Sequence, residues 1–133
     1  RFYKIKVFDE LYNDDVRGHI NAVHPGYYTR MGAAIRHATK LLEEQATSQK
    51  LLLILTDGKP NDLDKYEGRY GVEDTRQAVL DAEKKGLRPF CITIDEKAED
   101  HLPYLFGTNS YVHIKKAEEL PQKLPLLYMC LTA

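Results

Sequence analysis

The acidic residue Asp57 directly follows an uninterrupted apolar run, and this placement makes it the clearest candidate for chemistry. The run is Leu51-Leu52-Leu53-Ile54-Leu55-Thr56, and Gly58-Lys59-Pro60 comes after Asp57. An apolar segment without a polar face predicts a strand covered on both sides, as in a parallel sheet between helices. Such sheets bind ligands beyond the carboxyl ends of their strands, where Asp57 would lie. Asp and Gly are also common in turns, so an ordinary strand-ending turn is the alternative interpretation.

Thr29 is the second candidate donor. It lies in the loop from Pro25 to Gly32, which leads into a helix predicted over residues 32–46. Because that helix is followed by the strand that ends at Thr56, Thr29 and Asp57 are expected at the same end of the sheet. A hydroxyl and a carboxylate are hard oxygen donors suited to Mg²⁺ or Mn²⁺. Taken alone, Thr29 is also a suitable N-cap for the helix.

Periodicity predicts alternating strands and helices after an N-terminal edge strand over Phe2 to Phe8. The expected strands cover residues 51–56, 89–94 and 110–114, and the expected helices cover residues 32–46, 73–85 and 117–131. Gly86 is placed to end the second helix, whereas Pro121 and Pro125 predict an irregular start of the last one. The order of elements indicates an α/β fold with right-handed crossovers.

Composition and charge exclude several classes of function. The 133 residues suffice for one domain, and 43% hydrophobic with 29% charged residues is typical of a globular chain. A net charge of −1 provides no overall field for nucleic acid or an anionic membrane. No apolar stretch approaches the roughly 20 residues of a membrane span and no signal peptide opens the chain, so we expect a cytoplasmic protein. Cys91 and Cys130 lack metal-type spacing and are expected to be reduced residues of the core.

The residues around Thr29 and Asp57 resemble a known family. Thr29-Arg30-Met31-Gly32 and Thr56-Asp57-Gly58 resemble the second half of the metal-ion-dependent adhesion site of von Willebrand factor A domains. The longer segments 25–38, 55–71, 73–76 and 89–95 are similar to NorD-type nitric oxide reductase activation proteins. The resemblance implies a Rossmann-like three-layer fold whose mostly parallel sheet has an antiparallel edge strand. It also implies that residues 1–133 form one partial, N-terminally truncated von Willebrand factor A domain.

One part of the family's pattern is absent from this sequence. The family carries an Asp-x-Ser-x-Ser motif on an earlier strand, and these 133 residues contain no such motif. The resemblance therefore implies that Thr29 and Asp57 bind Mg²⁺ or Mn²⁺ in the complete domain, and that binding by this chain is weak or absent. The strand over residues 51–56 would have an open edge, which favours dimerisation, inward movement of the first strand, or uptake of the absent piece.

The resemblance implies a protein-docking function, not an enzyme. A cation held by few carboxylates keeps a coordination position for a partner's Asp or Glu. The expected partners are a MoxR-type AAA+ ATPase of the NorQ kind and a client metalloenzyme such as nitric oxide reductase. The sequence lacks a Walker-type phosphate loop, so the ATPase would supply the energy. The polar segment after Asp57 provides the expected partner-binding residues, which are Lys59, Asp62, Asp64, Tyr66, Arg69 and Tyr70.

Three alternatives remain open at this point. The polar segment is also compatible with a solvated loop whose ion pairs contribute little energy. The domain is also compatible with a subunit of a cobaltochelatase or rubisco-activase type complex. Finally, a Mg-dependent phosphoryl-transfer enzyme would use Asp57 as nucleophile or metal ligand and Lys59 as a phosphate clamp.

Overall fold

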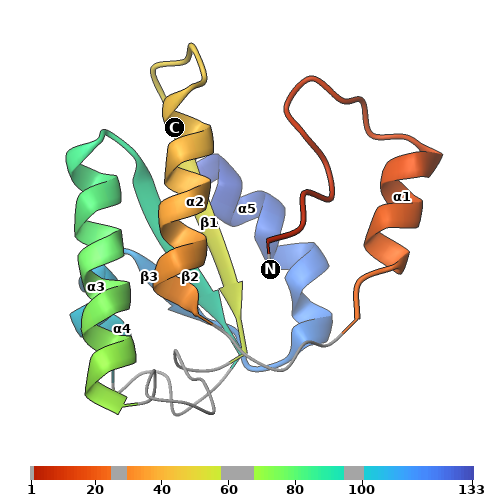
Figure 1. Ribbon diagram of the computed structural model, residues 1–133. Coiled ribbons are helices and arrows are strands. Elements are labelled where there is room, and N and C mark those ends of the chain that lie inside the picture. Colours follow the sequence, from red (N-terminus) through yellow and green to blue (C-terminus); the bar gives the residue numbers. More distant parts are fainter. Residues whose placement is uncertain (1, 25–29, 58–67, 95–100) are drawn as a thin grey trace.

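The structure, a computed structural model, describes residues 2–24, 30–57, 68–94 and 101–133. Its central element is a parallel sheet in the order β1-β2-β3, formed by Leu51–Thr56, Arg88–Thr93 and Tyr111–His113. The helices are α1 (Asp14–Asn21), α2 (Met31–Glu43), α3 (Gly68–Lys84), α4 (Leu102–Phe106) and α5 (Leu120–Thr132), with a 3₁₀ turn over Ala117–Glu119. Figure 1 shows α2 and α3 on one face of the sheet and α5 on the other. The expected three-layer α/β fold is confirmed.

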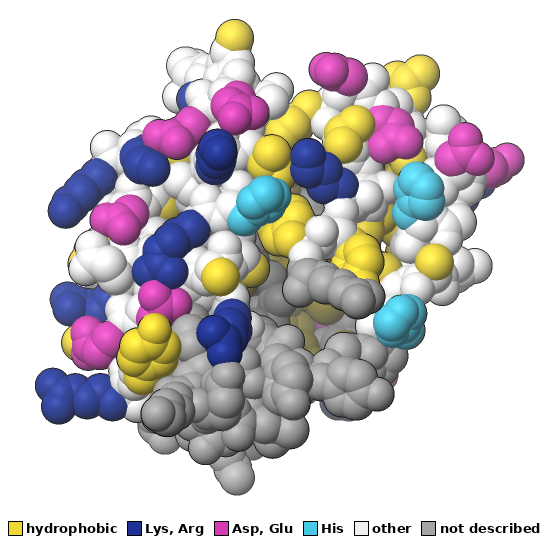
Figure 2. All heavy atoms as spheres, in the orientation of Figure 1, with side chains coloured by type: hydrophobic (Ala, Val, Ile, Leu, Met, Phe, Trp, Pro, Cys, Tyr) yellow, Lys and Arg dark blue, Asp and Glu magenta, His cyan; other side chains and the backbone are white. Residues whose placement is uncertain are grey.

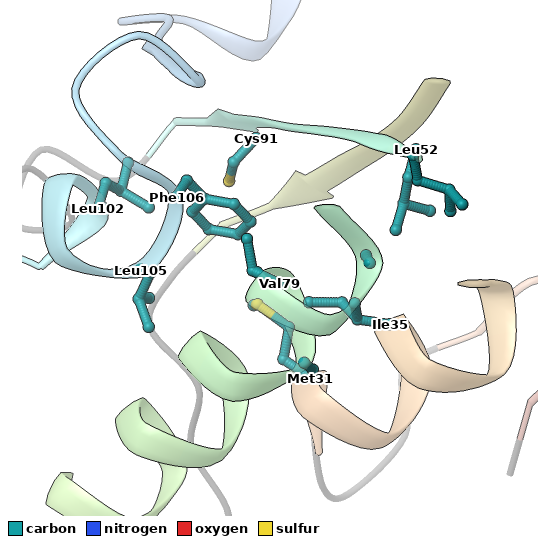
Figure 3. Packing of buried hydrophobic residues seen from close by; sticks show 11 residues of the cluster. Met31, Ile35, Leu52, Val79, Cys91, Leu102, Leu105 and Phe106 are labelled. Atoms are coloured by element: carbon teal, nitrogen blue, oxygen red, sulfur yellow. The ribbon is translucent and has the colours of Figure 1, made fainter. Parts of the chain in front are cut away.

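The core between the sheet and α2, α3 and α4 is built from the even-numbered side chains of β1 and the facing helix stripes. Leu52 and Cys91 come from the strands and contact this core cluster. In Figure 3 Cys91 points toward Phe106 of α4 and Val79 of α3. The buried members are Met31, Ile35, Leu52, Ala78, Val79, Ala82, Leu87, Cys91, Leu102, Leu105 and Phe106.

The opposite face of the sheet packs against α5. Phe90, Ile92 and Ile114 are buried there, and the inward stripe of α5 consists of Leu120, Leu124, Leu127 and Leu131. Tyr128 is exposed because it lies outside this stripe. Cys130 is also exposed, so the prediction that both cysteines belong to the core is correct only for Cys91. The predicted irregular start of the last helix is confirmed by the 3₁₀ turn before it.

Helix ends follow the local sequence. The amide of Leu87 donates to the carbonyl of Ala82 at 3.1 Å and that of Gly86 to Glu83 at 3.0 Å, while Gly86 has a φ of 85°. This pairing is a Schellman motif, and it confirms the role expected of Gly86. The helix that it ends begins at Gly68, five residues before the expected start at Glu73.

The N-terminal segment differs from the expectation. Phe2 to Phe8 was predicted to be an edge strand, but the structure assigns no strand to residues 2–13. Its backbone groups bond elsewhere: the His19 ring contacts the Ile5 carbonyl at 2.8 Å, and the amide of Val7 donates to Glu10 Oε1 at 3.1 Å. Those bonds replace the ladder that a strand would need, so the predicted antiparallel edge strand is wrong for this chain.

Helix α1 was not expected from the sequence. Its N-cap Asn13 accepts a hydrogen bond from the Val16 amide at 3.1 Å, and Asp14 and Asp15 lie in its first turn. Both features favour a helix start. Val16 is its buried residue, so the helix has little apolar stripe by which periodicity could reveal it.

Candidate functional site at the carboxyl edge of the sheet

Asp57 lies at the carboxyl edge of the parallel sheet. Thr56 is the register partner of Thr93, so β1 and β2 end at the same level, and Asp57 follows directly. Asp57 is exposed. A shallow pocket of about 380 Å³ opens beside it, lined by Leu55, Thr56, Asp57, Ile92, Ile94 and Leu120. The structure therefore places the Asp57 carboxylate where this class of sheet presents polar groups to ligands.

The start of α2 lies on the same side of the molecule as the end of β1 (Figure 1). The N-cap of α2 is Arg30, which makes no side-chain cap hydrogen bond, and Met31 and Gly32 are buried in the first turn. Thr29 precedes this N-cap and lies outside the described residues. Its convergence with Asp57 on one metal ion therefore stays a prediction.

The expected partner-binding residues divide into two groups. Arg69 and Tyr70 lie in the first turn of α3 and are exposed, Tyr70 by 64%. Lys59, Asp62, Asp64 and Tyr66 fall on residues outside the described part of the chain. A flat exposed tyrosine beside an arginine is a composition that protein interfaces favour, and this is the feature of α3 that bears on recognition.

Side-chain contacts with α2 and α4 hold the first half of α3 in place. Arg36 of α2 donates to Asp74 Oδ1 at 2.6 Å and to the Asp74 carbonyl at 3.1 Å. Tyr104 of α4 donates to Glu73 Oε1 at 2.5 Å, and the Arg76 guanidinium lies 4.4 Å from the centre of the Tyr104 ring. Glu73 and Asp74 therefore belong to a helix fastened to its neighbours, not to a solvated loop.

The same contacts set the protonation of Tyr104. The hydrogen bond to Glu73 raises the pKa of Tyr104, because the carboxylate stabilises the neutral hydroxyl. Arg76 acts in the opposite direction by favouring the phenolate. Sequence reasoning did not identify Tyr104, since it is 31 residues away from Glu73 and carries no local motif.

The donors at the edge fit a hard divalent cation only in part. Asp57 supplies a carboxylate oxygen and Thr56 a neighbouring hydroxyl, which are ligand types that Mg²⁺ accepts. Within the described ranges, no group of three or more His, Cys, Asp or Glu side chains is close enough to hold a metal ion. One carboxylate and one hydroxyl would fill only part of the coordination sphere of Mg²⁺.

The hydroxyl row at this edge was not predicted as a site feature. Thr93 is fully buried and lies opposite Thr56. Both strands end in threonine shortly before an acidic residue, in Thr56-Asp57 and Thr93-Ile94-Asp95. That repetition is the sequence signal that would have paired the two strand ends.

A family model confirms the resemblance inferred from the residues around Thr29 and Asp57. The model of the von Willebrand factor type A domain matches residues 5–126. The chain belongs to the von Willebrand factor type A domain family.

Within this family, the chain is similar to curated proteins of the NorD type. The chain is 61% identical to Protein NorD of Stutzerimonas stutzeri over 119 residues, which cover 90% of the chain and 19% of that protein. It is 50% identical to Protein NorD of Brucella suis over 131 residues, covering 98% of the chain and 21% of that protein. The chain is also 58% identical to an uncharacterized protein of Pseudomonas aeruginosa over 128 residues, which cover 96% of the chain and 21% of that protein.

The similarity to NorD-type proteins therefore extends over nearly the whole chain, yet the chain spans about a fifth of the length of these relatives. No solved structure matches it significantly. Among the described helices, none combines the length and apolar character that crossing a membrane requires.

Proposed function

We propose that this von Willebrand factor A chain is a metal-dependent protein-docking domain. Asp57 is the observation that carries the proposal, because an exposed carboxylate at the carboxyl edge of a buried strand is free to share a cation with a partner. Thr29 and Asp57 would hold Mg²⁺ or Mn²⁺ together with oxygens from outside this chain. The bound cation would supply an open coordination position for a carboxylate of the partner.

The surrounding elements give this docking site a rigid base. Asp57 follows a strand whose six residues are all in register with β2, so the carboxylate is attached to the sheet and not to a long loop. Arg36 and Asp74 fix the first half of α3 against α2, and the exposed Arg69 and Tyr70 lie in the first turn, before this contact. We infer that Arg69 and Tyr70, with Lys59, Asp62, Asp64 and Tyr66, select the partner while Asp57 supplies the metal-dependent contact.

The similarity to Protein NorD supports a particular cellular setting. We propose that the parent protein is a non-catalytic accessory protein of the cytoplasm that works with a MoxR-type AAA+ ATPase of the NorQ kind. Its client would be a metalloenzyme such as nitric oxide reductase, which the pair would activate during denitrification. The ATPase would supply the energy, and the von Willebrand factor A domain would recognise the partner protein.

Capture of the ATPase by the intact parent protein tests this function. Mg²⁺ is expected to raise capture by the wild type, and Asp57→Asn is expected to abolish the increase. Asp15→Asn is the matched control, because Asp15 is another exposed aspartate but lies on α1. Equal capture with and without Mg²⁺, or equal loss in both variants, would contradict metal-dependent docking through Asp57.

A further inference from the structure

Helices α3 and α4 together present tyrosine and arginine side chains at the surface. Tyr70 is 64% exposed and Tyr104 is 47% exposed, and Arg69 is exposed in the first turn of α3. Arg69, Glu73 and Arg76 are spaced by four and three residues, so they share one side of α3. Figure 2 shows basic side chains along α3, at the left of the view, with acidic ones among them. The surface formed by Arg69, Tyr70, Glu73, Arg76 and Tyr104 is called the α3–α4 face below.

Contacts within the α3–α4 face order its side chains before a partner arrives. The Tyr104 hydroxyl donates to Glu73 Oε1 at 2.5 Å, and the Arg76 guanidinium lies over the Tyr104 ring, 4.4 Å from its centre. Arg76 Nη1 also donates to the Tyr104 hydroxyl oxygen at 3.4 Å. Side chains that are already ordered lose less conformational entropy on binding. Exposed tyrosine and arginine, held in this way, are the residue types that dominate protein interfaces.

The donors and acceptors of the α3–α4 face favour a carboxylate as its ligand. Arg69 and Arg76 place two cations against the single carboxylate of Glu73, and the Tyr104 hydroxyl already binds Oε1 of that carboxylate. A guanidinium has five N–H donors in a planar fork, and the contact with Tyr104 involves Nη1 of Arg76. A carboxylate matches the geometry of this fork. The face is therefore complementary to an acidic segment.

The position of the α3–α4 face relates it to the Asp57 edge. Figure 1 shows the start of α3 at the same end of the molecule as the carboxyl end of β1. Asp74, the acidic residue next to Glu73, is paired with Arg36 of α2 at 2.6 Å, so its charge is balanced on the α2 side. A partner that approaches the Asp57 edge can therefore also reach the α3–α4 face.

We propose that the α3–α4 face binds an acidic segment of the protein that docks at the Asp57 edge. Arg69 and Arg76 bind carboxylates of this segment, and Tyr70 and Tyr104 pack against it. The identity of the partner rests on the proposed function, but the contact itself needs no cation. Because the contact lies at the surface and joins opposite charges, it should weaken as the salt concentration rises.

Fluorescence anisotropy of a labelled peptide of ten glutamates tests this contact in the intact parent protein. All samples contain EDTA, so that no divalent cation takes part in binding. Arg69→Gln and Arg76→Gln are each expected to raise the dissociation constant of the peptide by about fivefold. Glu73→Gln should lower it, because this substitution removes a carboxylate that repels the peptide. A purely structural role of Glu73 would give the opposite sign.

Arg17→Gln supplies the matched control. Arg17 lies on α1, 5.3 Å from the centre of the Tyr12 ring and 3.1 Å from Asp14, so this substitution removes an arginine from a similar set of side chains. It should leave the dissociation constant of the peptide unchanged. Equal weakening by Arg17→Gln and Arg76→Gln overturns the proposal, as does a peptide of ten lysines that binds as tightly as the glutamate peptide. Weaker binding by Glu73→Gln also overturns it.

The outcome of this experiment can be separated from that of the proposed function. A glutamate peptide that does not bind in EDTA overturns the acidic contact and leaves magnesium-dependent capture through Asp57 in place. Capture of the ATPase that is independent of Mg²⁺, together with peptide binding that depends on Arg69 and Arg76, contradicts metal-dependent docking and supports the acidic contact.

Discussion

Thr56 lies opposite Thr93 in the parallel ladder between β1 and β2, and this register fixes where Asp57 leaves the sheet. The two strands end together, so the exposed carboxylate of Asp57 stands at the rim of a pocket that both strands line. Thr93 is buried whereas Asp57 is exposed. The rim therefore combines a fixed base with an accessible oxygen donor, which is the property that the proposed docking function needs.

The ion pair between Arg36 and Asp74 is expected to stabilise the packing of α2 against α3. Its atoms are 2.6 Å apart, and the Asp74 side chain is only 21% exposed. Arg36→Ala should lower the free energy of unfolding by about 1 kcal/mol, a value reduced for the partial exposure of Arg36. Urea denaturation of the wild type and of Arg36→Ala measures this difference in the free energy of unfolding.

The exposed pair of Arg17 and Asp14 provides the control for this prediction. Its side chains are 63% and 95% exposed, so Arg17→Ala should have an effect close to zero. Equal effects of the two substitutions would show that partial burial does not strengthen the Arg36 pair.

Truncation of one methyl group in the core is expected to separate packed from exposed positions. Ile35 is 3% exposed and contacts the cluster shown in Figure 3, so Ile35→Val should lower the free energy of unfolding by about 1 kcal/mol. Ile20→Val makes the same change on α1, where Ile20 is 50% exposed, and should have little effect. Thermal unfolding that responds equally to both would argue against the assigned core.

The two cysteines are expected to react at different rates with a thiol reagent. Burial raises the pKa of Cys91 to about 12, so its thiolate is scarce at neutral and mildly alkaline pH. Cys130 is free and exposed. A disulfide reagent followed by absorbance should label Cys130 quickly in the native protein and Cys91 only after unfolding. Fast labelling that persists in Cys130→Ser would contradict the burial of Cys91.

The pKa of Tyr104 is expected to move in opposite directions when its two partners are removed. Glu73→Gln should lower it, because the carboxylate that stabilises the neutral hydroxyl is lost, and Arg76→Gln should raise it, because the nearby cation is lost. NMR titration of ring-labelled tyrosines, with Tyr104→Phe to assign the signal, measures both. Shifts of the same sign would refute the contact geometry.

The sequence was sufficient for elements whose signal is local. The uninterrupted apolar run predicted β1 with the bounds that the structure has, and Gly86 predicted the end of α3. Asp57 followed from the same reasoning, because the residue after a buried parallel strand must lie at the carboxyl edge. Each of these inferences needs only neighbouring residues.

Elements that depend on distant contacts were not predicted or were predicted wrongly. The segment Phe2 to Phe8 alternates as a strand does, but its Ile5 carbonyl bonds to His19 instead of a neighbouring strand. Helix α4 is only five residues long, too short for a periodic pattern. The Arg36 pair with Asp74 joins residues 38 positions apart, and no local spacing indicates such a contact.

Magnesium binding by the intact parent protein tests the central claim most directly. Calorimetry of the wild type should show a divalent cation site that Thr29→Ala weakens and Asp57→Asn abolishes, while Asp15→Asn leaves it unchanged. The expected loss follows because Thr29→Ala removes an oxygen ligand and Asp57→Asn removes the negative charge of the carboxylate, from a cation that dehydrates reluctantly. Equal magnesium affinity in the wild type, Thr29→Ala and Asp57→Asn would contradict a metal ion held by these two residues.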